Sequence, residues 1–262
     1  MNRLSKWIPC GVGAVLVGVM LISVGCGTSS TSSSRTAQLR VIPVAPSGPT
    51  LDLLIDNKSI FKSMAYGVPT AFTTVTAISH DFKLFDPAAG TDLLDNPTEP
   101  FTAGTTYTYL IVGNASSPTG IQGNKMTDDH TAPDKGNFKL RVVNGSPNVG
   151  AVDVYVIAPG SGYGGAKPTI GGLASNTAST YQSLASGGYQ IFVTPAGDSS
   201  CLTVFPLPPA PPIPDTCLIN MNGLNGTALP SFQSGQNRTL IMVNQIPGGG
   251  TYTTLPMLAD LN

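Results

Sequence analysis

The chain has 262 residues, of which only 10% are charged, and a formal net charge of −1. A field this weak does not favour nucleic acid as a partner, because the phosphate backbone attracts concentrated positive charge. Glu99 is the only glutamate, and long helices use Glu freely while avoiding the Gly and Pro that are abundant here. Short Val, Ile, Thr and Tyr runs interrupted by Gly and Pro instead predict an all-β protein.

The N-terminal residues predict an export signal. A positively charged start precedes an apolar run from Trp7 to Val24, which is followed by Gly25 and Cys26. This order is typical of a secretory signal peptide. A cysteine directly after the small residue resembles a bacterial lipoprotein signal, which implies that residues 1–25 are removed and that Cys26 carries acyl chains. A plain signal peptide or an uncleaved membrane anchor is the alternative.

Residues 26–37 are rich in Ser and Thr and contain no apolar anchor. Such a low-complexity stretch predicts a flexible tether. We therefore expect an exported protein of the bacterial cell envelope, with the membrane as a partner through a lipid anchor. Gly27 follows the cysteine where lipoproteins of the inner membrane have Asp, so the resemblance favours the outer membrane if the host has two membranes.

The first half, residues 38–129, has the apolar alternation of strands with one buried face. Leu51, Leu53 and Ile55 show this period of two before a turn at 56–58. Further strands are expected at 71–78, 82–85, 106–112 and 121–127.

The second half, residues 138–262, repeats this order after a linker at 130–137. Its expected strands are 152–156, 189–193, 239–243 and a closing segment at 252–261. About seven short strands with turns between them fit a β-sandwich. The sequence therefore predicts two tandem immunoglobulin-like antiparallel β-sandwich domains behind the signal peptide and the tether.

A duplicated motif begins each half. Its members recur at equal spacing in the two copies: Leu39-Arg40-Val41, Pro46 and Asp52, then Leu140-Arg141-Val142, Pro147 and Asp153. These residues resemble the bacterial domain of unknown function 4397, which carries an Arg-Val…Ser-Pro…Val-Asp-Val-Tyr-Val signature. The resemblance implies secreted or lipid-anchored sandwich domains, often in tandem, and no known activity. The His that this family usually has three residues before the Pro is replaced by Pro43 and Asn144.

Asp52 and Asp153 interrupt apolar strands, where Asp is unfavourable. Each is expected either to face solvent or to accept hydrogen bonds from a neighbouring loop. A ligand or metal role is the alternative. Because the same Asp recurs in both halves without a catalytic partner nearby, we interpret the motif as a structural part of the module.

The cysteines predict one disulfide. Cys10 lies in the signal and Cys26 is the lipid candidate, which leaves Cys201 and Cys217. An even pair in an exported domain is typical of a disulfide, and this one would close a Pro-rich insertion. Two free thiols are the alternative.

Metal and nucleotide sites are poorly supported. Asp86, Asp92 and Asp95 share one Pro- and Gly-rich segment and are weak candidates for a calcium loop, although their spacing fits no EF-hand. The run Asp128-Asp129-His130 is expected to be a solvated charge run in a linker. A Gly-rich run at 160–165 matches G-x-G-x-x-G, but no helix start follows it, so a lengthened loop is favoured over a nucleotide site. No cofactor is predicted.

Catalytic sets are also lacking, so we do not expect an enzyme. There is no G-x-S-x-G elbow, and His80 lies in what looks like a hairpin turn. The function favoured by the sequence is a non-catalytic binding or structural module of the envelope, contacting an envelope protein or a glycan through the loops at 159–172 and 201–217. The alternative is a carbohydrate-directed protein, which would need Tyr163, Tyr181 and Tyr189 to line one groove with an acid pair across it.

Overall fold

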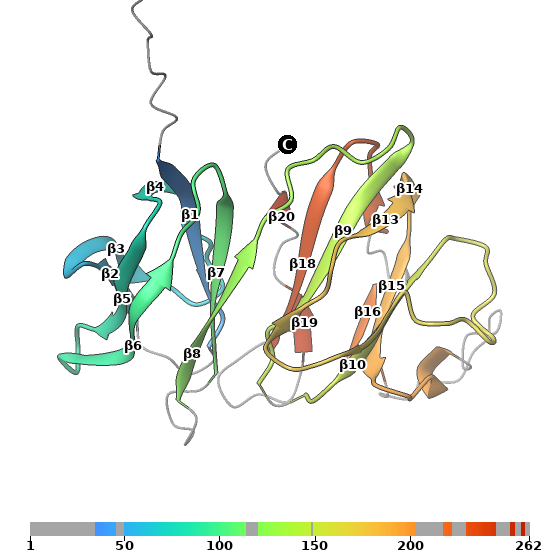
Figure 1. Ribbon diagram of the computed structural model, residues 1–262. Helices are drawn as coiled ribbons and strands as arrows, with labels where there is room; N and C mark the ends of the chain where they lie inside the picture. The colour runs from blue at the N-terminus through green and yellow to red at the C-terminus, as the bar shows by residue number, and fades with distance from the viewer. Residues whose placement is uncertain are drawn as a thin grey trace, which may run out of the picture. The chain divides into compact units, whose positions relative to one another are not determined.

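Each half of the chain contains two facing β-sheets, so the expectation of an all-β, sandwich-like protein is confirmed (Figure 1). The computed structural model describes residues 35–45, 50–113, 120–147, 149–202, 217–221 and 229–244, with the backbone of 252–254 and 258–259. The predicted signal peptide, Cys26, nearly all of the tether, Pro46 and the Pro-rich part of the 201–217 segment lie outside these residues. Residues 34–262 form one compact unit. Within the described part of the chain, no helix is long and apolar enough to span a membrane.

The first half contains two sheets. The inner sheet contacts the second half, and the outer sheet lies on the other side of the first-half core. The inner sheet has the order β4 (Thr73–Thr76), β1 (Thr36–Pro43), β7 (Thr106–Gly113) and β8 (Ile121–Thr127). The outer sheet has the order β3 (Lys58–Met64), β2 (Leu51–Ile55), β5 (Ser79–Asp86) and β6 (Thr91–Pro100). Strand β1 pairs parallel with β7, and the other pairings are antiparallel.

The second half has the same pairing pattern. In its inner sheet β9 (Asn137–Asn144) is flanked by β12 (Thr177–Ala178) and β13 (Gln182–Ala185) on one side and by β18 (Asn237–Asn244) on the other, and β18 pairs with β19 (Tyr252–Thr254) and β20 (Leu258–Ala259). Its outer sheet has the order β11 (Ile170–Leu173), β10 (Val152–Ile157), β15 (Gln190–Pro195) and β16 (Ile219–Met221). A short pair joins β14 (Gly187–Gly188) to β17 (Ser231–Phe232). Strand β9 is parallel to β18, as β1 is to β7.

The turn before the parallel strand is equivalent in the two halves. Phe101 and Phe232 are buried, and each is followed by a glycine with positive φ, Gly104 or Gly235. The amide of Gly104 donates to Thr36 O and that of Gly235 to the carbonyl of Asn137, both at 2.8 Å. The left-handed conformation explains why glycine recurs at this place.

Three apolar clusters explain the long hydrophobic runs of the inner strands. One fills the first half and contains Leu39 and Val41, and a second fills the other half. A third joins residues of both inner sheets, among them Ile42 and Ile241. Successive side chains of a strand point to opposite faces, so an inner strand with a core on each side is buried along its whole length, as β7 is.

Several described strands were not anticipated, and one was expected to be longer. In the second half these are the short strands β11, β12, β13, β14, β16 and β17. In the first half no strand was expected at β3 or β6, and the expected loop around Asp92 and Asp95 is wrong, because both residues lie on β6. Pro97 interrupts the apolar pattern there. Proline is tolerated there because β6 is an edge strand. On the open side of an edge strand, the missing amide donor has no neighbouring strand to bond. The strand expected at 71–78 is confined to β4.

Candidate functional site at the junction of the halves

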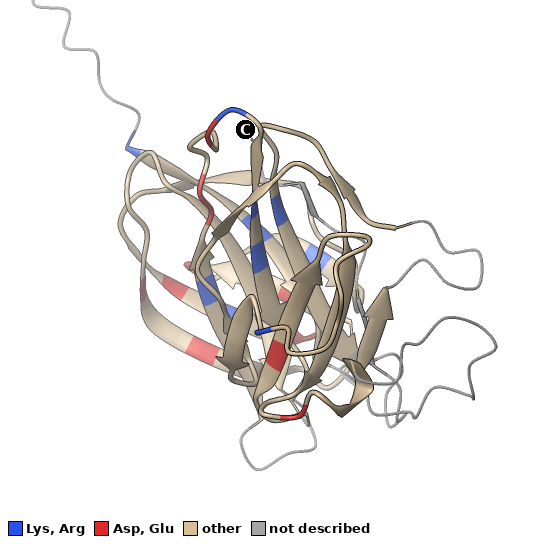
Figure 2. Ribbon diagram, turned by 90° about the vertical axis from the view of Figure 1, so that its right-hand side faces the viewer, with Lys and Arg blue, Asp and Glu red and all other residues tan. Residues whose placement is uncertain are grey.

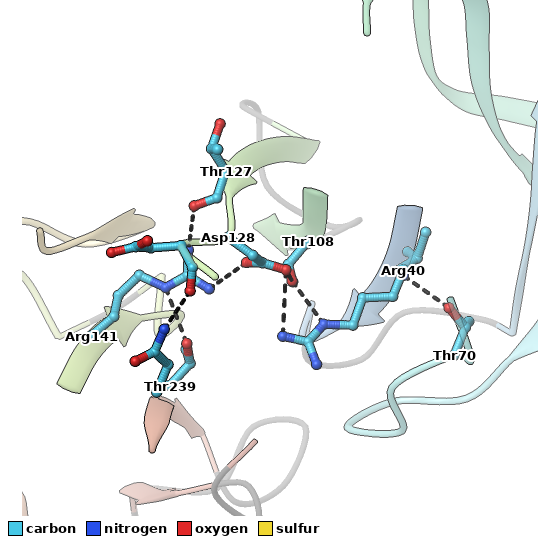
Figure 3. A network of polar contacts seen from close by, with 10 residues as sticks. Arg40, Thr70, Thr108, Thr127, Asp128, Arg141 and Thr239 are labelled. Carbon is cyan, nitrogen blue, oxygen red and sulfur yellow. Dashed lines mark hydrogen bonds and ion pairs between the residues drawn. The ribbon is translucent and has the colours of Figure 1, made fainter. Parts of the chain in front are cut away.

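A buried carboxylate links the two halves. Asp128 is only 4% exposed, and its Oδ1 accepts a hydrogen bond from Arg141 Nη2 at 2.6 Å (Figure 3). Its Oδ2 accepts one from Thr108 Oγ1 at 2.6 Å and lies 3.7 Å from Arg40 Nη2. The expectation of a solvated charge run is therefore wrong for Asp128, which follows β8 into the contact between the inner sheets.

The two arginines occupy equivalent places. Arg40 is paired in register with Thr108, and Arg141 with Thr239. Each arginine donates from Nε to the hydroxyl of that threonine, at 2.7 Å and 3.1 Å respectively. The duplicated Leu-Arg-Val motif thus places one arginine from each half at the junction, on either side of a single carboxylate.

Each arginine also lies on an aromatic ring. The guanidinium carbon of Arg40 is 4.8 Å from the ring centroid of Phe72, and that of Arg141 is 4.8 Å from the ring of Tyr181. Such cation–π contacts add to the attraction of the carboxylate. Phe72 precedes β4 and Tyr181 precedes β13, so the rings are equivalent in the two halves.

Two hollows open beside this network. The larger, of ≈ 650 Å³, lies between β8 and the segment from Thr177 to Tyr181. The second, of ≈ 580 Å³, lies between the start of β7 and the segment that follows β8. Thr127, Asp129 and Tyr181 line both.

The charged residues at these hollows are paired. Lys125 forms an ion pair with Glu99, Asp129 accepts from Lys139 at 2.6 Å, and Arg141 binds Asp128. Figure 2 shows that charged positions are sparse over the ribbon as a whole. The junction therefore presents polar groups with little net charge.

Acid is expected to weaken the fold through Asp129. Burial raises the pKa of this carboxyl, but hydrogen bonds from Lys139 and Thr131 outweigh that effect and lower the pKa to about 2 from 3.8. A pKa that is lower in the folded state contributes stability that is present above pH 3.8 and is lost as the pH falls toward 2. Urea unfolding between pH 5 and pH 2 should show this loss. The slope should be smaller in Asp129→Asn, and an equal slope in both proteins would contradict the assignment.

The motif aspartates accept hydrogen bonds from neighbouring loops or strands. Asp52 Oδ1 accepts from the amide of Ser63 at 2.7 Å. Asp153 accepts from Gly172 N at 2.7 Å and from Gly197 N at 2.8 Å. Ser63 and Gly172 both have positive φ, and the paired strands are irregular in register beside each aspartate. The carboxylate thus satisfies an amide that the irregular ladder leaves unpaired.

Replacing Asp153 with alanine is expected to lower the free energy of unfolding by about 2 kcal/mol, because two backbone donors lose their acceptor. Asp92→Ala is the matched control, since this carboxylate is exposed on β6 and its loss should change the free energy by less than ~0.5 kcal/mol. Urea denaturation measures both. Equal effects would mean that the amides at Gly172 and Gly197 find other partners.

The remaining motif residues lie in the turn after β9. Asn144, at the position where the family has His, is fully buried and donates from Nδ2 to Gly150 O at 2.9 Å and to Leu173 O at 3.2 Å. Its Oδ1 accepts from the amide of Ser146 at 3.3 Å. Asn144 therefore closes the turn that contains Pro147.

The weak metal and catalytic candidates are dispersed. Asp86 accepts from the amides of Ala88 and Ala89 and so shapes the turn after β5, while Asp92 and Asp95 lie on β6. Among the described residues, no group of three His, Cys, Asp or Glu side chains could hold a metal ion. His80 lies on β5 and is buried, so its placement in a turn is wrong. Its Nδ1 is 2.6 Å from Asp56 Oδ2, and its Nε2 is 2.9 Å from Thr76 O.

The tyrosines of the carbohydrate alternative do not share a groove. Tyr181 lies at the junction, whereas Tyr189 belongs to the core of the second half. Tyr163 packs edge-on against Phe192 at 5.4 Å, on the opposite face of the outer sheet. The tyrosine groove required by that alternative is therefore absent.

The Cys201–Cys217 disulfide is confirmed, with Cα atoms 5.4 Å apart. Cys201 is fully buried and packs with Tyr155 and Phe192 on the far face of the outer sheet. The Gly-rich loop contributes Tyr163 and Ala166 to the same cluster. The described residues of these two segments thus cover a sheet face, which gives them a packing role.

The first part of this unit is similar to a known protein family. Residues 37–155 match the family profile of DUF4397, a domain of unknown function. The match begins in β1 and ends in β10, so it includes both copies of the arginine motif and Asp128. The resemblance drawn from those residues is confirmed.

Other comparisons add little to the DUF4397 match. A search of curated proteins found no match. Among solved structures, one similar chain is the CBMbc module (family CBM26) of Eubacterium rectale Amy13K in complex with maltoheptaose. It has 11% sequence identity and a TM-score of 0.25, and the likeness covers 84% of this chain and 95% of that one. A likeness at this level carries no functional argument.

Sequence reasoning identified both arginines but missed how they are used. Asp128 has no counterpart in the second half and stands in a run of polar residues with Asp129 and His130. Neither repetition nor hydrophobic context therefore distinguished it in the sequence. The available signal was Arg40 and Arg141 themselves, because a buried cation requires an anion.

Proposed function

We propose that this protein is a non-catalytic, lipid-anchored binding module of the bacterial cell envelope, made of two tandem immunoglobulin-like domains joined into one rigid unit. The observation that carries the rigid part is the buried contact of both arginines with Asp128. The two halves are joined by a shared core and an ion network, not by a flexible linker alone. These contacts hold the surface that spans the two halves in one conformation. A fixed surface suits binding, because less ordering entropy is lost when a partner arrives.

Support for a non-catalytic role comes from the chemistry-bearing side chains. Asp52 and Asp153 satisfy backbone amides, and Asp128 holds two arginines. His80 lies between Asp56 and a backbone carbonyl, and its hydrogen bond lowers the pKa of the Asp56 carboxyl. The side chains of these residues are engaged in contacts that stabilise the fold.

The anchoring part rests on the sequence. A signal followed by Cys26 and a Ser/Thr-rich tether would hold the folded unit away from the membrane surface. The DUF4397 match is consistent with the resemblance to secreted and lipid-anchored proteins.

Cys26→Ser is expected to move the protein from the membrane fraction to the soluble exported fraction. Cys10→Ser is the matched control, since that cysteine lies inside the predicted signal, and the variant should stay with membranes. Fractionation with immunoblotting reads out both, and mass spectrometry of the mature N-terminus should find an acylated Cys26. An unmodified N-terminus at another residue would refute the lipoprotein proposal.

A further inference from the structure

We infer that the two hollows at the junction form one binding site for a neutral oligosaccharide, with Tyr181 as its aromatic platform. The hollows share Thr127, Asp129 and Tyr181, so the tyrosine lies where they meet. The larger hollow, ≈ 650 Å³, is within the range of small-molecule sites. This deepens the proposed function by naming a ligand class and a place for binding.

The charges at the site favour a neutral ligand. Of the residues that line the hollows, Lys125, Asp129 and Arg141 each have a partner of opposite charge at close range. A charged ligand would have to compete with these pairs, and at Arg141, which is 3% exposed, it would pull a buried ion away from its partner, which is costly. A neutral ligand needs no such exchange.

The remaining lining offers hydrogen bonds around one aromatic ring. Side chains of Asn124, Thr127 and Thr180 supply hydroxyl and amide groups along the larger hollow. Tyr181 is partly exposed there, and Arg141 lies on its ring and holds it in place. A tyrosine fixed in this way presents an apolar body with polar groups around it. A sugar ring has matching chemistry, with C–H groups on its faces and hydroxyls at its rim.

The position of the site follows from the duplication. Strand β8 ends the first half and the segment from Thr177 to Tyr181 belongs to the second. The two walls are held together by the Asp128 network and by a hydrogen bond from Asn124 Nδ2 to Asn176 O at 2.7 Å. Neither half alone would supply both walls.

Binding to defined hexasaccharides tests the inference. The full chain, purified in the sugar-free detergent lauryldimethylamine oxide, is titrated calorimetrically with cellohexaose, maltohexaose, mannohexaose and, as a charged probe, hexagalacturonate. At least one neutral hexamer should bind more tightly than hexagalacturonate. Tyr181→Ala should weaken that binding by about tenfold or more. Binding at the wild-type level in this variant, provided it is folded, would overturn the inference.

A second variant covers the case in which Tyr181→Ala fails to fold. Thr127 is exposed and lines both hollows, so Thr127→Lys obstructs them while leaving the arginine network in place. Binding should fall by a similar factor. Thr98→Lys makes the same change at an exposed position on β6 and should leave binding within about twofold.

The other outcomes are also decisive. No binding of any neutral hexamer, a preference for hexagalacturonate, or undiminished binding in Thr127→Lys would refute the site. None of these results bears on the anchoring proposal, which is read out by fractionation of Cys26→Ser. Shortened hexasaccharides recovered after the titration would instead contradict the non-catalytic proposal.

Discussion

Asp128→Asn is expected to lower the free energy of unfolding by about 3–5 kcal/mol, the usual result of removing one partner from a buried ion pair. Arg40 and Arg141 are 5% and 3% exposed, so neither can recover full hydration without opening the junction. An amide keeps the size of the carboxyl group but removes the charge that the guanidinium groups face. Urea unfolding followed by circular dichroism measures the change.

Asp134→Asn is the matched control. This aspartate lies a few residues further along the same connection and is exposed, so the same substitution should change the free energy by less than ~0.5 kcal/mol. If Asp128→Asn proved as mild as the control, the network would be dispensable to the fold. The junction would then depend on apolar contacts alone.

Strands marked by local sequence signals were predictable, whereas those that depend on their place in a sheet were not. Strands such as β2 and β7 were predictable, because apolar alternation and flanking turn residues are local signals. Strand β6 was not, because Asp92, Asp95 and Pro97 disguise it. An edge strand needs only one buried face and tolerates proline, so its sequence resembles a loop.

The candidate site depended almost entirely on non-local contacts. Equal spacing of Arg40 and Arg141 showed that the motif was duplicated, but spacing cannot show that two copies face each other. The use of Asp128 follows from that arrangement. Tyr181 was noted in the sequence for its aromatic ring, and its place beside Arg141 emerges only when β13 pairs with β9.

The shared apolar cluster makes the halves energetically dependent. On β18, Leu240 belongs to the core of the second half, while its neighbour Ile241 belongs to the cluster that joins both halves. One face of the strand therefore stabilises a domain and the other stabilises the junction. A separated pair of domains would have left the second face polar.

Ile241→Ala is accordingly expected to lower the free energy of unfolding by about 4 kcal/mol, the upper part of the usual range for such a truncation, since Ile241 is only 1% exposed. Because the cavity would lie at the junction, the slowest-exchanging amides of β2 and β10 should lose protection by the same factor. Hydrogen exchange measured by mass spectrometry resolves the two strands.

Ile78→Ala is the control for this prediction, because it makes the same substitution at a side chain that is 55% exposed. Its effect should stay below ~0.5 kcal/mol. Loss of protection confined to β10 in Ile241→Ala would show that the second half unfolds independently. In that case the surface spanning the two halves would not be held rigid, and the proposed site between β8 and Tyr181 would be assembled only part of the time.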